Sequence, residues 1–191
     1  MELTNLADIK KLLLKNGIVL TKARGQNFII NPSVCPRMAE ECGAGKDDGV
    51  LEIGPGIGVL TAELAKVAGK VVSIELDSGL VPILSETLSN FDNVKIIEGD
   101  ALKLNLKEII EREFSGKKVF VCANIPYNIS SKLVMKLLES DLNIEAVTVM
   151  VQKEFADRIC AKVGSRQSGA ITVGAAFFAS CTELFGVSAG S

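Results

Sequence analysis

The sequence contains no histidine, and its five cysteines include no C-x-x-C pair. Zinc sites are built largely from cysteine and histidine at short spacings, so we expect neither a metal site nor a disulfide framework. The missing histidine also removes the side chain that serves most often as a general base. The chemistry of this protein is therefore expected to avoid strong base catalysis or to use another group.

Long apolar runs are missing as well. The longest candidate, 'AITVGAAFFASC', is shorter than a bilayer span and includes Thr172 and Gly174. The first residues, 'MELTNLADIKK', contain acidic side chains and no apolar core of the type that marks a secretory signal. We therefore expect a cytoplasmic protein with no membrane partner.

Charge is unevenly distributed along a chain with the composition of a globular protein. Of its 191 residues, 48% are hydrophobic and 23% are charged, and the net charge of −2 argues against non-specific binding of nucleic acid by the whole surface. Residues 1–24, which include Lys22 and Arg24, and residues 153–166 are locally basic. These stretches are either solvated helix faces or patches that contact phosphate groups.

Hydrophobic periodicity predicts strands that alternate with helices. One helix is expected after a cap at Thr4 or Asn5 and ends at Gly17, and a second runs from about Ser33 to Cys42. From Val50 onward, helical patterns separate the strand patterns 'VLEIG', 'KVVSIELD', 'NVKIIEGD', 'KVFVCAN' and 'AVTVMVQ', with a long connection before 'KVFVCAN'. This alternation predicts an α/β fold with a mostly parallel sheet and helices on both faces.

The stretch 'LEIGPGIGVL' places Gly54, Gly56 and Gly58 at a strand-to-helix turn. Glycine lets the backbone approach a ligand closely and adopt positive φ, although a tight turn in any α/β domain explains this stretch equally well. The G-x-G-x-G spacing differs from the dinucleotide fingerprint, and no phosphate-binding G-K-[ST] follows. The turn is therefore informative only together with other residues.

Polar side chains follow the ends of the next predicted strands. Glu75 lies about 20 residues beyond the glycine turn, where an acid can bind both hydroxyls of a ribose. Asp100 and Asn124 occupy the corresponding position after two later strands. Ligands of open α/β sheets bind at this edge, so the pattern predicts an adenosine-bearing ligand without a pyrophosphate.

Six motifs occur in the order found in one enzyme family: 'GQNFI', 'LEIGPGIGVLT', 'IELD', 'EGDAL', 'NIPYNIS' and 'MVQKEFADRI'. From about Thr21 onward the sequence resembles S-adenosylmethionine-dependent rRNA adenine N6-dimethyltransferases. It is most similar to the branch that dimethylates two adjacent adenosines near the 3′ end of small-subunit (16S) rRNA during ribosome biogenesis. The resemblance implies a Rossmann-like class I methyltransferase fold, S-adenosylmethionine as cofactor and the immature small ribosomal subunit as partner.

The resemblance also assigns roles at the cofactor. It divides the chain into an N-terminal helical and cofactor-lid segment, residues 1–48, and a methyltransferase core, residues 49–191. It implies that Glu75 binds the ribose and that Asp100 accepts a hydrogen bond from the adenine amino group. The remaining implied cofactor contacts are Gln26, Asn27, Gly54 and Gly56 at the methionine end, Leu76 and Ala101 around the adenine ring, and Asn124.

The catalytic residues implied by the resemblance are Asn124, Ile125, Pro126 and Tyr127, the only tyrosine. The Asn124 side chain and the Ile125 carbonyl can accept from the two N–H groups of the target N6, so that its lone pair points at the methyl donor. Pro126 favours an extended Ile125, and Tyr127 can stack on the extruded base. A proline turn with the tyrosine packed beneath it is the simpler alternative. The candidate RNA contacts are Lys22, Arg24, Lys153 and Arg158.

The sequence departs from the family at its end, 'ELFGVSAGS'. Family members continue with a Phe-x-Pro-x-Pro segment, a final strand and a small helical C-terminal domain. We therefore expect a shortened chain whose final strand and C-terminal helical domain are missing. In such a chain the sheet edge beside 'CTELFGV' is unpaired, and cofactor binding is retained.

Three alternatives stay open. Large-subunit rRNA adenine methyltransferases of the macrolide-resistance type share the glycine turn and the N-I-P-Y element, whereas 'KARGQNFI' and 'MVQKEFADRICA' favour the small-subunit branch. A ribosome-assembly binding module with vestigial activity is the second alternative. A methyltransferase that acts on a small molecule is the third.

Overall fold

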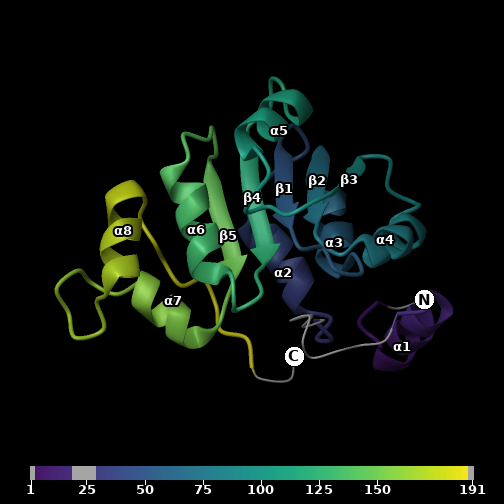
Figure 1. Cartoon of the computed structure of the whole chain (residues 1–191), viewed down its shortest axis with the longest axis horizontal. Coiled ribbons are helices and arrows are strands. Elements are labelled where there is room, and N and C mark those ends of the chain that lie inside the picture. The colour runs from purple at the N-terminus through teal and green to yellow at the C-terminus, as the bar shows by residue number, and fades with distance from the viewer. Residues whose placement is uncertain (1–2, 19–28, 189–191) are drawn as a thin grey trace.

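A single parallel sheet forms the centre of the computed structural model, which describes residues 3–18 and 29–188 (Figure 1). The spatial order of the strands is β3-β2-β1-β4-β5. The chain adds β2 and β3 on one side of β1, and then returns to place β4 and β5 on the other side. The reversal point lies between β1 and β4. The strands are β1 (Gly49–Ile53), β2 (Lys70–Glu75), β3 (Val94–Glu98), β4 (Val119–Asn124) and β5 (Ala146–Met150).

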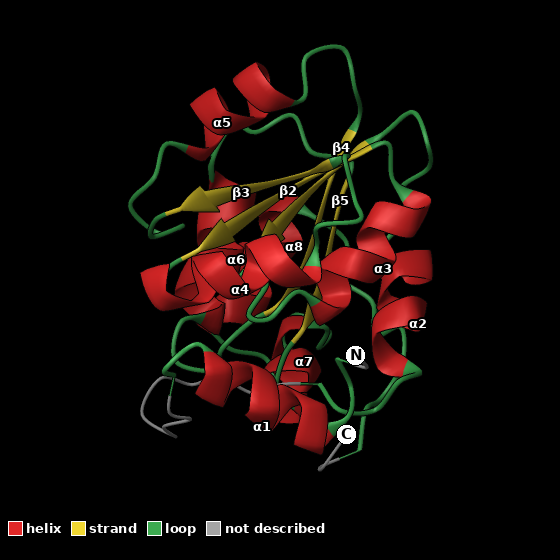
Figure 2. Ribbon diagram, turned by 90° about the vertical axis from the view of Figure 1, so that its right-hand side faces the viewer, coloured by secondary structure: helices red, strands yellow, loops and turns green. Residues whose placement is uncertain are grey.

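Helices cover both faces of the sheet, as predicted (Figure 2). Successive side chains of a strand point to opposite faces, so neighbouring residues of β1 enter different apolar clusters. Val50 packs with α2 (Val34–Glu41) and α3 (Val59–Val67), whereas Leu51 packs with α5 (Leu106–Glu113) and α6 (Ser130–Glu139). The near-continuous apolar character of β1 follows from this burial on two sides.

The N-terminal helix α1 (Leu6–Lys15) packs beside the carboxyl end of the sheet, toward which the strand arrows point in Figure 1. It begins at Asn5, whose side chain accepts from the backbone N–H groups of Ala7 and Asp8, as expected of an N-cap. Ile9, Leu12 and Leu13 of α1 pack with Ile57, with Leu80 of the 3₁₀ turn η2 (Ser78–Leu80) and with Ile83 of α4 (Val81–Thr87). The division of the chain at residue 48 stays a prediction.

Two expectations about local structure need correction. The long connection before β4 contains a helix, α5, which Asn105 caps by accepting from the Glu108 N–H at 3.3 Å. The stretch 'CTELFGV', residues 181–187, forms no strand. A strand requires a neighbour for its hydrogen bonds, and β4 is the only described strand that pairs with β5. Phe185 lies instead under the Arg37 guanidinium, 4.1 Å from its ring centroid.

The last helices continue from the carboxyl end of β5. Helix α7 (Lys153–Ile159) begins three residues after β5, and α8 (Ala170–Phe178) packs against α6 and α7. The Thr172 hydroxyl fixes this contact by donating to the Arg158 carbonyl at 2.6 Å. In the part of the chain that the structure describes, no helix has the length and apolar character needed to cross a membrane.

Candidate functional site

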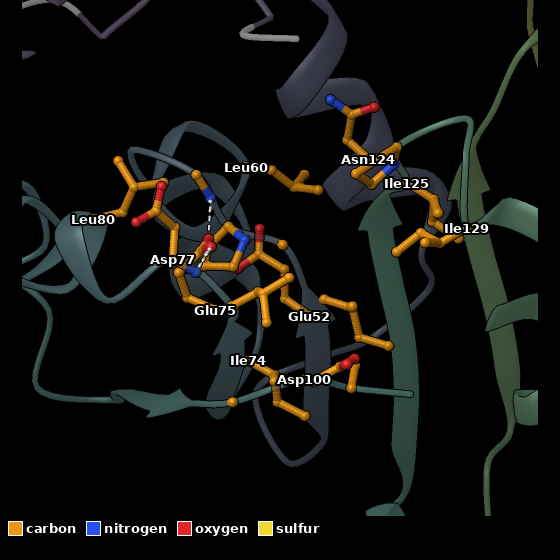
Figure 3. Close-up of a pocket in the computed structure, with 18 of the residues that line it drawn as sticks. Glu52, Leu60, Ile74, Glu75, Asp77, Leu80, Asp100, Asn124, Ile125 and Ile129 are labelled. Atoms are coloured by element: carbon orange, nitrogen blue, oxygen red, sulfur yellow. Dashed lines mark hydrogen bonds between the residues drawn. The ribbon is translucent and has the colours of Figure 1, made fainter. Parts of the chain in front are cut away.

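A cavity of about 570 Å³ opens at the carboxyl ends of the strands, where the chain reverses between β1 and β4. Figure 3 shows Glu75, Asp100 and Asn124 arranged around it, each from the end of a different strand. Parallel strands bring their carboxyl ends to one edge, which explains why residues far apart in sequence meet here. The structure thus brings together the side chains predicted after β2, β3 and β4.

The glycine turn forms one wall of the cavity. Gly54, Gly56 and Gly58 have φ values of 74°, 62° and 92°, in the left-handed region that favours glycine. A Cβ added at Gly54 would meet no protein atom within 4 Å, whereas one at Gly58 would lie 3.1 Å from Thr87 Oγ1. Gly54 therefore leaves room for a ligand, and Gly58 allows close packing against the end of α4.

Glu75 is fixed by the backbone of two loops. Its Oε2 accepts from the Gly56 N–H at 3.1 Å and its Oε1 from the Asp77 N–H at 2.8 Å. Burial raises the pKa of Glu75, and the hydrogen bonds from Asp77 and Gly56 oppose that rise. A carboxylate has about four lone-pair positions, so each oxygen can still accept a hydrogen bond from a ligand.

Glu52 is a buried carboxyl group that the sequence analysis did not single out. It lines the cavity and is 1% exposed, and its Oε2 accepts from Ser73 Oγ at 2.6 Å. Burial raises its pKa to about 7, and the nearby Glu75 adds to the rise. Its Oε1 is buried without a hydrogen bond from any described residue. The available signal was an acid in the middle of an otherwise apolar strand.

Asp100 begins a turn at the opposite side of the cavity. Its Oδ1 accepts from the Leu102 N–H at 2.9 Å, and its Oδ2 lies 3.6 Å from the Nζ of Lys103. Ala101 is buried in the cavity wall, whereas Leu76 lies at the rim with 70% of its surface exposed. Apolar side chains in the lining are suited to contact with a flat ring.

The described lining of the cavity is acidic. It includes Glu52, Glu75, Asp77 and Asp100 and contains no lysine or arginine. Such a lining attracts a positively charged ligand and repels phosphate groups. This charge pattern agrees with the absence of a phosphate-binding motif.

The end of β4 forms the remaining wall. Asn124, Ile125 and Pro126 line the cavity, and the Ile125 N–H donates to the Met150 carbonyl at 3.1 Å. The Pro126 carbonyl accepts from Ser130 Oγ at 3.1 Å, which closes the turn. Tyr127 does not line the cavity and is 60% exposed, so it is not packed beneath the turn.

The other predicted residues lie outside the cavity or outside the described residues. Lys153 and Arg158 are exposed on α7, and the Lys153 ammonium forms an ion pair with Asp157 at 3.0 Å, which raises the pKa of Lys153. No group of metal-binding side chains occurs within residues 3–18 and 29–188. The predicted residues outside the described ranges are Lys22, Arg24, Gln26 and Asn27.

The parallel sheet, the glycine turn and the acidic cavity define a Rossmann-like methyltransferase fold. Two solved structures support this class: a dimethyladenosine transferase from Plasmodium falciparum and the 23S rRNA methyltransferase ErmE. The first has a TM-score of 0.64, 34% identity, and coverage of 75% of this chain and 50% of that one. The second has a TM-score of 0.62, 34% identity, and coverage of 72% of this chain and 53% of that one.

Sequence comparison identifies the family. A sequence model of the ribosomal RNA adenine dimethylase family matches residues 20–189, and the chain belongs to this family. The ribosomal RNA small subunit methyltransferase A of Shouchella clausii is 45% identical over 174 residues, covering 91% of this chain and 59% of that protein. Its counterpart in Bacillus licheniformis is 40% identical, covering 93% of this chain and 61% of that protein. The chain thus spans about three fifths of the length of these relatives.

Proposed function

We propose that this protein transfers methyl groups from S-adenosylmethionine to N6 of two adjacent adenosines near the 3′ end of small-subunit rRNA. The observation that carries the proposal is the convergence of Gly54, Glu75, Asp100 and Asn124 on one acidic cavity in a member of the rRNA adenine dimethylase family. S-adenosylmethionine carries a sulfonium and an ammonium group, which suit the acidic side chains among the described lining residues.

The cofactor would lie along the ends of β1, β2 and β3. The Glu75 carboxylate would accept from both ribose hydroxyls, and the open space at Gly54 would admit the methionine portion. The Oε1 of Glu52, which accepts no hydrogen bond from a described residue, would favour a cationic group of the ligand. Leu76 and Ala101 would enclose the adenine ring, while Asp100 would accept from its amino group.

The target adenine would enter beside Asn124. When bound, S-adenosylmethionine would supply an activated methyl group; the sulfur would keep the electrons of the broken S–C bond, and N6 would release one proton to water as it gains the methyl group. The amide oxygen of Asn124 and the carbonyl of Ile125 would hold the two N–H groups of N6 and direct its lone pair toward the cavity. Because Tyr127 is exposed next to this turn, its ring is free to stack on an extruded base. Alignment of this kind needs no histidine as a base.

The partner in this proposal is the immature small ribosomal subunit, which implies a cytoplasmic location. Lys22, Arg24, Lys153 and Arg158 are the proposed RNA contacts. The similarity to ErmE keeps a second candidate open, methylation of the same atom in large-subunit rRNA. The small-subunit assignment is preferred because the curated relatives named above carry that name over more than 90% of this chain.

A calorimetric titration with S-adenosylmethionine tests the cofactor site. Glu75→Ala is expected to weaken binding by roughly tenfold or more, because it removes the acceptor for both ribose hydroxyls. Glu98→Ala is the matched control, because Glu98 pairs in register with Glu75 on β3 but does not line the cavity. A wild-type chain that is folded and does not bind contradicts the proposal, as does an equal effect of the two substitutions.

The reaction is tested by methyl transfer to purified unmethylated small subunits and to unmethylated large-subunit RNA in parallel. Transfer to small subunits that is lost in Asn124→Ala, with cofactor affinity measured separately, is the expected result. Transfer only to the large-subunit RNA supports the second candidate. A ribosome-binding role without catalysis predicts that Asn124→Ala still fulfils the function in cells.

A further inference from the structure

Lys136, on α6, directs all its donors at one turn of the cavity wall. Its Nζ donates to the carbonyls of Ala101, Leu102 and Leu104 at 2.9, 2.8 and 2.9 Å. An ammonium has three N–H groups, so these three carbonyls use its whole donor capacity. The turn follows β3 and begins at Asp100, the residue proposed to bind the cofactor's adenine.

The turn has carbonyl groups that need such a partner. It is a single helical turn, in which the N–H groups of Lys103 and Leu104 donate to the Asp100 carbonyl at 2.8 and 2.9 Å. The chain leaves this turn before α5 begins at Leu106, so the carbonyls at its end are not continued into a helix. A cation is favourable at this position for the reason that lysine is favourable at a helix C-terminus.

Helix α6 also contacts the loop at the other side of the cavity. Ile129, immediately before α6, lines the cavity, and Ser130 at its start donates to the Pro126 carbonyl at 3.1 Å. Lys136 lies further along the same helix. One rigid element therefore connects the turn proposed to hold the adenine of the cofactor with the loop proposed to hold the target base.

We infer that Lys136 is a positioning residue of the cofactor site, which holds the Asp100 turn at a fixed distance from α6. The inference rests on the proposed function, because it assigns Lys136 an effect on the ligand proposed for the cavity. Lys136 does not itself line the cavity. Its effect reaches the ligand through Asp100, whose carboxylate is oriented by the Leu102 N–H of the same turn.

The test compares S-adenosylmethionine affinity in Lys136→Met, Lys136→Arg and Lys132→Met by calorimetric titration, with thermal unfolding of each variant. Lys132 is the matched control, because it lies one turn earlier on α6 and is exposed. Lys136→Met is expected to bind roughly tenfold more weakly than wild type. Lys136→Arg should lose less affinity than Lys136→Met. A planar guanidinium cannot converge on all three carbonyls, but it still donates to some of them. Lys132→Met should bind as wild type does.

A double-mutant cycle with Asp100→Ala separates positioning from a general loss of stability. If Lys136 acts through Asp100, the double variant binds no more weakly than Asp100→Ala alone. Additive losses, or a folded Lys136→Met with wild-type affinity, overturn the inference. If Lys136→Met does not fold, Lys136→Arg decides: weaker binding than wild type supports the inference, and equal binding overturns it. Failure of the wild type itself to bind removes the proposed function and the inference together, and so differs from failure of the inference alone.

Discussion

A buried glutamate lies near each end of the sheet, Glu52 on β1 and Glu113 at the end of α5, and the two residues differ in their partners. Glu52, on β1 at the carboxyl end, accepts a hydrogen bond from Ser73, and its charged neighbour is another acid, Glu75. Glu113, at the amino end, lies within 3.1 Å of nitrogen atoms of Lys70, Lys95 and Arg112. Burial raises the pKa of Glu52 to about 7, whereas the three cations lower the pKa of Glu113 to about 2.

This difference separates the proposed binding site from a structural ion cluster. The carboxylate of Glu113 is fully compensated within the protein, so it needs no ligand. Among the described residues Glu52 has hydrogen-bonding partners but no cation beside it, and burying a carboxylate without a cation is costly. An acid that is buried beside a cavity and has no ion-pair partner among the described residues is therefore the better indicator of function.

The largest expected effect is that of Glu52→Gln on the pH dependence of the free energy of unfolding. A carboxyl group with a folded-state pKa of about 7 and an unfolded value of 4.5 favours folding less as the pH rises. Its contribution is fully present below pH 4.5 and is lost as the pH passes 7, a change of about 3 kcal/mol in the free energy of unfolding. Urea unfolding at a series of pH values should show this fall in the wild type and largely remove it in Glu52→Gln. Parallel curves for the two proteins would contradict the prediction.

The next largest effect is expected from substitutions at Gly54 and Gly116, which should differ in their effect on cofactor affinity. Gly54 and Gly116 both have positive φ, 74° and 76°, and at both positions an added Cβ meets no atom within 4 Å. Gly54→Ala and Gly116→Ala should each cost about 1 kcal/mol of stability through the strained backbone. Only Gly54→Ala should also weaken S-adenosylmethionine binding, by roughly tenfold, because its methyl group enters the cavity. Equal affinities in the two variants would show that the ligand does not approach Gly54.

The smallest effect is expected at Glu113. Its lowered pKa means that its stabilisation is present above pH 4.5 and is lost as the pH falls toward 2, opposite in direction to Glu52. The Lys95 and Arg112 side chains are 52% and 56% exposed, so solvent screens the cluster. Glu113→Gln should reduce the fall in the free energy of unfolding between pH 4.5 and pH 2. Its affinity for S-adenosylmethionine should be unchanged. A change in affinity would show that the two ends are coupled.

Most elements were predictable because their signals are local. The strand at Lys70–Glu75 and the helix at Leu6–Lys15 follow from residue periodicity and a capping asparagine. The gathering of Glu75, Asp100 and Asn124 followed from a general rule, since parallel strands end at a common edge. Helix α5 was not predicted, although Leu106, Ile109 and Ile110 repeat at helical spacing, because the residues before β4 were described only as a long connection.

Other features depend on contacts that no local pattern contains. Residues 181–187 have a strand-like composition, yet β structure needs a neighbouring strand, and Phe185 packs against the α2 side of the molecule. Similarly, Gly54 and Gly58 are indistinguishable in the sequence, and only the positions of the cavity and of α4 give them different roles.

The sequence by itself determined the alternation of strands and helices, the glycine turn and the identity of the side chains at the strand ends, because each depends on residues close together in the chain. The tertiary structure decided that Glu52 is buried with no cation from the described residues beside it while Glu113 has three, and that Lys136 reaches the turn of Asp100. The physical reason is that burial and electrostatic compensation depend on which distant groups come within a few ångströms, and packing alone sets those distances.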